Sequence, residues 1–361
     1  MPLLIKFSIT LFLPDRHCSE SLNAMIFRSS PKTHQDAARS PLFKHGGSGV
    51  LVLLLCLIIV SPARAQIFKL PPPSEAVIGT IRYTTSTQAN TLLDIARYYD
   101  FGYEEIRQAN PSVDTWLPGA GTPVVLPMRY ILPTAPRKGI VVNVAEMRLY
   151  YYPKPKAGRV HVVETFPISI GRGDWRTPLT RTRVTAKTTN PVWHPTASIR
   201  AEHAADGDPL PSRIAAGDDN PLGRFALRLG LPEYLIHGTN KAFGIGMQVT
   251  HGCIRLYPKD IEQLFYGVPV GTPVRIVNQP YKAGWRNGTL YLEVHPLLEG
   301  ASPEEQQNKT PLVQTLIDAT RLHPHYPIDW RKVDELARKQ NGIPEAVGPV
   351  LMAADEVSVR Q

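Results

Sequence analysis

The residues best suited to chemistry lie in one segment, IHGTNKAFGIGMQVTHGCIRL, which runs from residue 236 to 256. It holds two histidines, His237 and His251, and one of the three cysteines of the chain, Cys253. A cysteine attacks as the thiolate, and a free thiol ionises near about pH 8.5, so it needs a neighbouring base or positive charge to act at neutral pH. The segment therefore predicts a cysteine nucleophile with a histidine base.

The spacing of these residues suggests how strands would bring them together. His251 precedes Cys253 by two residues, so on one extended strand both side chains would point to the same side. His237 lies sixteen residues before Cys253, which suits a neighbouring strand. The segment also has glycines at positions 238, 244, 246 and 252. A glycine lets the backbone turn sharply or come close to a neighbouring chain segment. Backbone N–H groups at Gly252 and Cys253 would then be placed to hold a developing oxyanion.

Two other interpretations fit the same residue types. A zinc site would take His237, His251 and Cys253 as three ligands, with His203 or His194 as a fourth. The chain has no C-x-x-C or H-E-x-x-H motif to support such a site. Alternatively, the cysteine is a buried structural residue beside core histidines. Residue types alone leave both alternatives open.

The start of the chain predicts an export signal. An apolar run over residues 50–60 follows a basic stretch and precedes a small-x-small site that ends at Ala65. We expect residues 1–65 to be a signal peptide with a long charged region, beginning at Met1 or Met25 and cleaved after Ala65. The run is about half of what a spanning helix needs, so no permanent membrane span is expected and the mature protein would lie in the periplasm.

Removing this segment leaves Cys253 as the sole cysteine. Residues 66–361 then carry 33 Lys and Arg against 28 Asp and Glu, which gives a net charge of +5. An unpaired thiol in an oxidising compartment is either inert or kept for its chemistry. A weakly basic surface suits an anionic polymer. No basic run with interleaved aromatic residues argues for nucleic acid.

The length and composition indicate a multidomain α+β protein. We expect five regions after the signal. They are a proline-rich linker (66–79), a small βααβ domain (80–128), a mainly-β domain built as a sandwich or barrel (138–278), a small C-terminal α/β extension (279–343) and a disordered tail (344–361).

Particular patterns place the expected elements. A first helix capped by Asn90 or Thr91 and a second near residues 103–108 make the βααβ unit. IVVNVAEMRLYYYP predicts a hairpin, VHVVETFPISIG another strand pair and PVRIV a closing strand. Residues 193–217 are expected to form a long loop. Asn287-Gly288 predicts a hairpin turn, and two helices should follow, over residues 312–322 and from about Asp329.

The βααβ unit resembles a LysM domain, a small glycan-binding module of cell-wall proteins. The residues that carry the resemblance span the whole unit: Tyr83, Thr91-Leu92, Ile95-Ala96, Tyr98, Ile106, Asn110-Pro111, Gly121 and Pro127. The resemblance implies that this unit binds the glycan of peptidoglycan.

The opening segment resembles the signature of the L,D-transpeptidase (YkuD-type) catalytic domain. The match is carried by HGTN, then G-I-G, then THGCIRL, in which Thr250 comes before His-Gly-Cys. It extends to about residues 138–277 through NPLGRFALRL and PVGTPVRIV. With AGWRNGTLYLEVHPLLE and the module before it, the chain looks like the periplasmic enzymes of Gram-negative bacteria.

This resemblance implies an acyltransferase that acts on tetrapeptide stems without a metal or cofactor. Cys253 would attack the carbonyl of the L-centre of meso-diaminopimelate and expel D-alanine, with His237 as base and acid. Gly238 would orient the imidazole through its carbonyl, and His251, Gly252, Thr250 and Arg255 would support the site.

The resemblance leaves the acyl acceptor open. The favoured acceptor is the terminal lysine of an outer-membrane lipoprotein, and the alternatives are a diaminopimelate amine, which would give a 3→3 cross-link, or water. A wall-binding protein without activity is a different possibility, against which the intact His237 and Cys253 argue.

Overall fold

A computed structural model describes residues 65–155 and 157–351. The expected signal peptide, with its two candidate start residues, lies outside the described residues, apart from Ala65 at its end. No helix in the described ranges is both long enough and apolar enough to cross a membrane.

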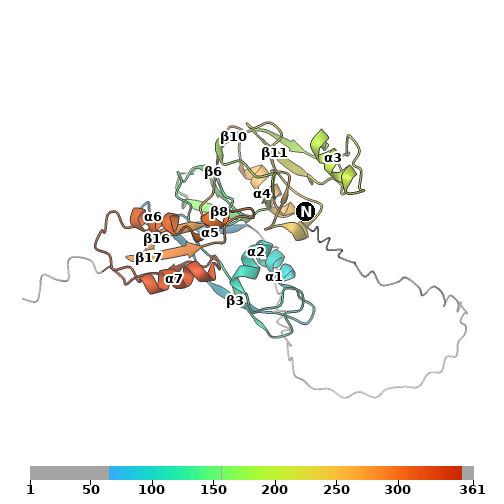
Figure 1. Cartoon of the computed structure of the whole chain (residues 1–361). Helices are drawn as coiled ribbons and strands as arrows, with labels where there is room; N and C mark the ends of the chain where they lie inside the picture. The colour runs from blue at the N-terminus through green and yellow to red at the C-terminus, as the bar shows by residue number, and fades with distance from the viewer. Residues whose placement is uncertain (1–64, 156, 352–361) are drawn as a thin grey trace, which may run out of the picture. The chain divides into compact units, whose positions relative to one another are not determined.

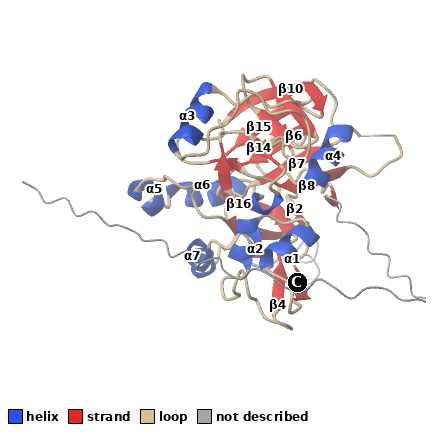
Figure 2. Cartoon of the chain, turned by 90° about the vertical axis from the view of Figure 1, so that its right-hand side faces the viewer, coloured by secondary structure: helices blue, strands red, loops and turns tan. Residues whose placement is uncertain are grey.

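The segment that carries His237 and Cys253 belongs to one mixed sheet (Figures 1 and 2), which has a large apolar core on one face and a second apolar cluster against part of the other. Its strand order is β1 (Gln66–Lys69), β8 (Val162–Pro167), β7 (Arg148–Tyr152), β6 (Gly139–Asn143), β15 (Pro273–Val277), β10 (Thr180–Thr189), β11 (Phe225–Leu229), β12 (Leu235–His237) and β14 (Ile254–Arg255). The β6–β15 and β12–β14 pairs are parallel, and the others are antiparallel. The mainly-β prediction for this region is confirmed.

Alternating apolar side chains place the larger core on one face of this sheet, while Val141, Tyr150 and Val163 face a second cluster on the other. Val274 and Ile276 of β15 face inward beside Val184 of β10, as do Leu227 and Leu229 of β11. Helix α4 (Pro258–Gly267) packs against this core through one apolar face. The predicted hairpin of β6 and β7 is confirmed by their antiparallel register.

Two predictions about strands at the start of the chain are wrong. The expected linker 66–79 contains β1, which joins the sheet beside β8, and β2 (Val77–Gly79), which pairs with β5 (Arg129–Ile131). Strands of three or four residues are too short to show alternation in sequence. The second run of VHVVETFPISIG is β9 (Ile170–Gly171), which pairs with β13 (Gln248–Thr250) and not with β8.

The βααβ order is as predicted. It consists of β3 (Arg82–Thr85), α1 (Leu92–Tyr99), α2 (Tyr103–Ala109) and β4 (Pro123–Leu126), with the two strands antiparallel. Thr91 caps α1, because its hydroxyl accepts from the Asp94 amide while the Asp94 carboxylate accepts from the Thr91 amide.

The C-terminal part adds a second small sheet with helices against it. Its elements are β16 (Tyr281–Arg286), β17 (Thr289–Val294), α5 (Pro303–Gln307), α6 (Thr310–Ala319), α7 (Trp330–Lys339) and β18 (Glu345–Ala346). The Asn287-Gly288 turn is confirmed, with φ of 49° and 73°. The prediction of a disordered tail from residue 344 is wrong for residues 344–351. In this stretch β18 pairs with β17, and Val347 is buried.

Candidate active site

Strand pairing brings the two central residues of the site to one face of the sheet. In the parallel β12–β14 pair, Ile236 lies beside Ile254 and His237 beside Arg255. Ile236 and Ile254 are buried in the core, so their neighbours point away from it. His237, Arg255 and Cys253, which comes directly before β14, therefore lie on the opposite face, on adjacent strands.

His237 is buried and held by the backbone. Its Nδ1 lies 2.7 Å from the Gly238 carbonyl oxygen, which fixes Nδ1 as the protonated nitrogen and leaves Nε2 as an acceptor. Burial, together with the charge of Arg255, lowers the pKa of His237 to about 3. The imidazole is therefore neutral at neutral pH and able to accept a proton.

The Cys253 thiol is half-buried, and its Sγ lies 3.5 Å from the Glu233 carbonyl oxygen. Burial raises the pKa of Cys253, although a backbone contact at Leu235 and the charge of Arg255 act in the opposite direction. Burial also lowers the pKa of Arg255 itself. The charge of Arg255 thus lowers the pKa of both the imidazole and the thiol.

The predicted shared strand for His251 and Cys253 is wrong. Strand β13 ends at Thr250, β14 starts at Ile254, and between them Gly252 adopts a φ of +96°. This left-handed residue turns the chain, so His251 points toward α3 (Ala197–Ala205). Its Nε2 donates to Glu202 Oε2 over 2.6 Å, and its ring meets Trp175 edge to face at 5.0 Å between centroids.

Two threonines brace this turn. The Thr250 hydroxyl donates to the Cys253 carbonyl over 2.6 Å, and the Thr177 hydroxyl donates to the Gly252 carbonyl over 2.9 Å. A side chain at 252 would also meet the Tyr234 ring, since an added Cβ would lie 2.8 Å from it. The turn that presents Cys253 is therefore fixed from both sides.

The chain matches known proteins over this site and beyond it. The family model of the L,D-transpeptidase catalytic domain matches residues 137–276. Probable L,D-transpeptidase YbiS of Escherichia coli K12 is 41% identical over 290 residues, which cover 79% of this chain and 92% of that protein. Probable L,D-transpeptidase ErfK/SrfK of Salmonella typhimurium is 43% identical, with 77% and 89% covered. The chain belongs to the L,D-transpeptidase family.

In this L,D-transpeptidase the βααβ unit contacts the loop between His237 and Cys253. The amides of Tyr103 and Glu104, in the first turn of α2, donate to the carbonyls of Ile245 and Gly246 over 2.9 and 3.2 Å. An added Cβ at Gly246 would lie 2.3 Å from the Tyr103 nitrogen. The G-I-G part of the signature is therefore the surface on which α2 sits.

The geometry does not favour the zinc alternative. His237 Nδ1 is engaged by Gly238 and His251 by Glu202. Within residues 65–155 and 157–351, the group of ligand atoms close enough to share an ion is Glu146, Glu293 and His295, in a different part of the fold.

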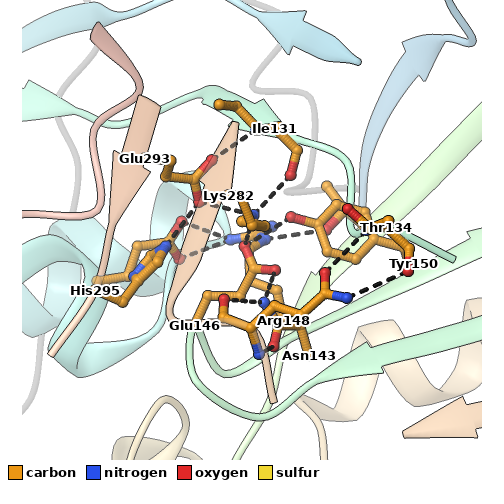
Figure 3. Close-up of polar contacts among 12 residues, drawn as sticks. Ile131, Thr134, Asn143, Glu146, Arg148, Tyr150, Lys282, Glu293 and His295 are labelled. Carbon is orange, nitrogen blue, oxygen red and sulfur yellow. Dashed lines mark hydrogen bonds and ion pairs between the residues drawn. The ribbon is translucent and has the colours of Figure 1, made fainter. Parts of the chain in front are cut away.

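That group already encloses a cation (Figure 3). Lys282 Nζ lies 2.7 Å from Glu146 Oε2 and 2.8 Å from Glu293 Oε1, and donates to the Ile131 carbonyl over 2.6 Å. His295 Nε2 lies 2.7 Å from Glu293 Oε1. The ammonium group takes the place that a metal ion would need, and it links β5, the β6–β7 turn and the C-terminal sheet of the L,D-transpeptidase.

Sequence reasoning missed Glu202 and Thr177. Glu202 lies on α3, within the segment expected to be a loop, and forms an ion pair with Arg172 as well as the contact with His251. The Thr196 side chain caps this helix, and Pro195-Thr196 before ASIRAEHAA is a signal that would have predicted it. Contacts of Glu202 with residues 30 and 49 positions away have no local signature.

Proposed function

We propose that the protein is a peptidoglycan L,D-transpeptidase in which Cys253 is the nucleophile and His237 the general base and acid. The observation that supports the proposal is the register of β12 and β14, in which His237 lies beside Arg255 and Cys253 directly precedes β14. Membership of the family supports the substrate, a tetrapeptide stem ending in diaminopimelate and D-alanine.

The protonation states suggest the order of events. The thiol is protonated and the imidazole neutral at rest, so His237 Nε2 takes the Sγ proton as Sγ bonds to the carbonyl carbon of the L-centre. The Nδ1–H bond to the Gly238 carbonyl stabilises the imidazolium that forms. The proton then passes to the amine of D-alanine, the C–N bond breaks, and a thioester remains.

The turn before β14 supplies the oxyanion donors in this proposal. Among the described residues, neither the Gly252 nor the Cys253 amide donates to another backbone group. Both are therefore available to the developing negative charge. An incoming amine, deprotonated by His237, would attack the thioester and regenerate the thiol.

We infer the terminal lysine of an outer-membrane lipoprotein as the favoured acceptor. The support is the order of a LysM-like unit before the catalytic domain and the sequence FGIGMQVTHGCIRL. The LysM-like unit would bind glycan, and the export signal would deliver the enzyme to the periplasm. A diaminopimelate amine is the second candidate acceptor.

A carbapenem tests the nucleophile directly. Mature protein, residues 66–361, should gain one covalent adduct by intact-protein mass spectrometry, and Cys253→Ala should gain none. His237→Gln should slow acylation by roughly 100-fold or more, in the range of a lost general base. If wild type forms no adduct but still binds peptidoglycan, the protein is a wall-binding module without activity.

Muropeptide analysis separates the acceptors. In a strain that lacks the gene, loss of lipoprotein-linked fragments with 3→3 dimers unchanged supports lipoprotein attachment. Loss of 3→3 dimers alone contradicts it and selects cross-linking.

A further inference from the structure

The strands that carry the active site have a one-sided charge. Strands β15, β10, β11, β12 and β14 are consecutive in the sheet. They contain no aspartate or glutamate, and their basic residues are Arg181, Arg183, Lys187, Arg228, Arg255 and Arg275. Positive charge is therefore concentrated on the part of the sheet that ends at the thiol.

Four of these arginines lie on the sheet face opposite to the larger core, where Arg275 is paired with Val141 at the edge of the second cluster. Arg181 pairs directly with Arg275, and the flanking residues Val274 and Ile276 face the core, so both arginines point away from it. Arg183 lies two residues after Arg181 and shares its side. Lys187 differs, because its Nζ reaches the Val268 carbonyl beside α4.

Arg228 extends this face to the active site. Its neighbours Leu227 and Leu229 are in the core, and it lies beside Leu235 of β12. Cys253 stands one residue before Ile254, the partner of Ile236, and is thus level with Leu235. Two strand spacings, about 10 Å, separate the backbones of Arg228 and Cys253, with both side chains on the same face.

In the part of the chain that the structure describes, these four guanidinium groups have no acidic partner. Among the ion pairs of residues 65–155 and 157–351, none includes Arg181, Arg183, Arg228 or Arg275. The first three are exposed and Arg275 is half-buried. A guanidinium binds a carboxylate through two parallel N–H bonds, so the face is complementary to a ligand with several carboxylates.

We propose that Arg181, Arg183, Arg228 and Arg275 form a binding surface for the carboxylates of peptidoglycan stem peptides and lead the donor stem to Cys253. This inference rests on the proposed function, which supplies the substrate. A stem ending in diaminopimelate and D-alanine carries more than one carboxylate, and neighbouring stems on a glycan strand repeat them. Arg228 holds the part of the stem nearest the thiol, and the other three engage carboxylates farther from it.

Binding measured without turnover tests the surface. Mature enzyme with Cys253→Ala is titrated with a fluorescent disaccharide-tetrapeptide and with the same ligand after amidation of its carboxylates. Arg228→Gln should weaken binding of the acidic ligand roughly two- to five-fold, the range for one exposed ion pair. The triple variant R181Q/R183Q/R275Q should weaken it further and flatten its salt dependence.

Matched controls separate this effect from net charge and from folding. Arg331→Gln removes the same charge from an exposed position on α7 and should leave binding unchanged. Amidation of the ligand's carboxylates should likewise have no effect in the quadruple variant R181Q/R183Q/R228Q/R275Q, which lacks all four guanidinium groups. Thermal unfolding should be the same for all variants, since the substituted side chains form no ion pair within the described ranges 65–155 and 157–351.

Two results overturn the proposal. One is equal binding of the acidic ligand by wild-type and arginine variants. The other is arginine-dependent binding to vesicles containing an anionic phospholipid, with stem binding unaffected, which assigns the face to a membrane surface. Failure of the proposed function is distinct, because it appears as absence of a carbapenem adduct at Cys253 in protein with all four arginines intact.

Discussion

Burial, more than any ion pair, determines the resting charges of the two central side chains. It lowers the pKa of His237 to about 3 and raises that of Cys253. At neutral pH the imidazole is therefore unprotonated and the thiol protonated. A preformed imidazolium–thiolate pair would require the reverse order of the two pKa values, so in the proposed mechanism the proton moves as the thiol attacks.

The pH dependence of thiol alkylation tests this order. Because the thiolate is the nucleophile, the rate with iodoacetamide should rise roughly ten-fold per pH unit from about pH 6 to 9, without a plateau. Arg255→Gln should shift the profile to higher pH, since the Arg255 charge lowers the Cys253 pKa, and Arg255→Lys should restore it in part. A plateau between about pH 5 and 7 would show an ion pair and contradict the assignment.

At the scale of elements, the loop between His237 and Cys253 owes its position to a helix from another part of the chain. The first amides of any α-helix lack partners within it, and those of α2 find theirs in the Ile245 and Gly246 carbonyls. The contact requires glycine at position 246, because a Cβ added there would lie only 2.4 Å from the Gly102 Cα. We expect the βααβ unit to hold this loop in place.

Two alanine substitutions in the same loop test this contact. Gly246 has a φ of +89° and no room for a Cβ, whereas at Gly244 the nearest atom, on Val249, would be 3.8 Å from an added Cβ. Gly246→Ala should reduce carbapenem acylation and expose α2 to hydrogen exchange, while Gly244→Ala should change neither. Similar behaviour of both variants would show that the α2 contact does not position the loop.

The elements that sequence predicted are those with local signals. The Thr91 capping box, the Asn287-Gly288 turn and the β6–β7 hairpin each depend on neighbouring residues, and each is present. For β12 and β14, the spacing of His237 and Cys253 predicts neighbouring strands but does not predict that they are parallel. By contrast, β1 depends on its pairing with the distant strand β8, and the contacts of Glu202 on α3 with Arg172 and His251 join residues far apart in the chain. A short stretch of sequence does not encode such contacts.

At the scale of the whole molecule, the buried Lys282 joins regions that are distant in sequence. Its partners are Glu146 of the β6–β7 turn, Glu293 of β17 and the Ile131 carbonyl of β5, and all three charged side chains are almost fully buried. Burial would raise the pKa of Glu293, but Lys282 and His295 outweigh it and hold that pKa below 4.5. The cluster depends on its central positive charge.

Lys282→Met should destabilise the protein far more than its size change implies. Methionine fills much of the same volume but leaves Glu146 and Glu293 buried without a cation, which costs about 3–5 kcal/mol of unfolding free energy. Lys332→Met, which removes a partly exposed pair with Glu345, should cost at most about 1 kcal/mol. Urea denaturation of both variants against wild type measures the difference.

The pH dependence of that deficit identifies its cause. In wild type the contribution of ionised Glu293 is fully present above its unfolded pKa, near 4.5, and is lost as pH falls through its lower folded pKa. In Lys282→Met, burial is no longer offset, so Glu293 should take up a proton at higher pH and become neutral. The deficit should therefore be largest at the high end of the pH range and shrink as pH falls through the raised pKa of Glu293 in the variant and on toward its lowered pKa in wild type. A deficit that is constant with pH would attribute the loss to packing and not to the uncompensated carboxylates.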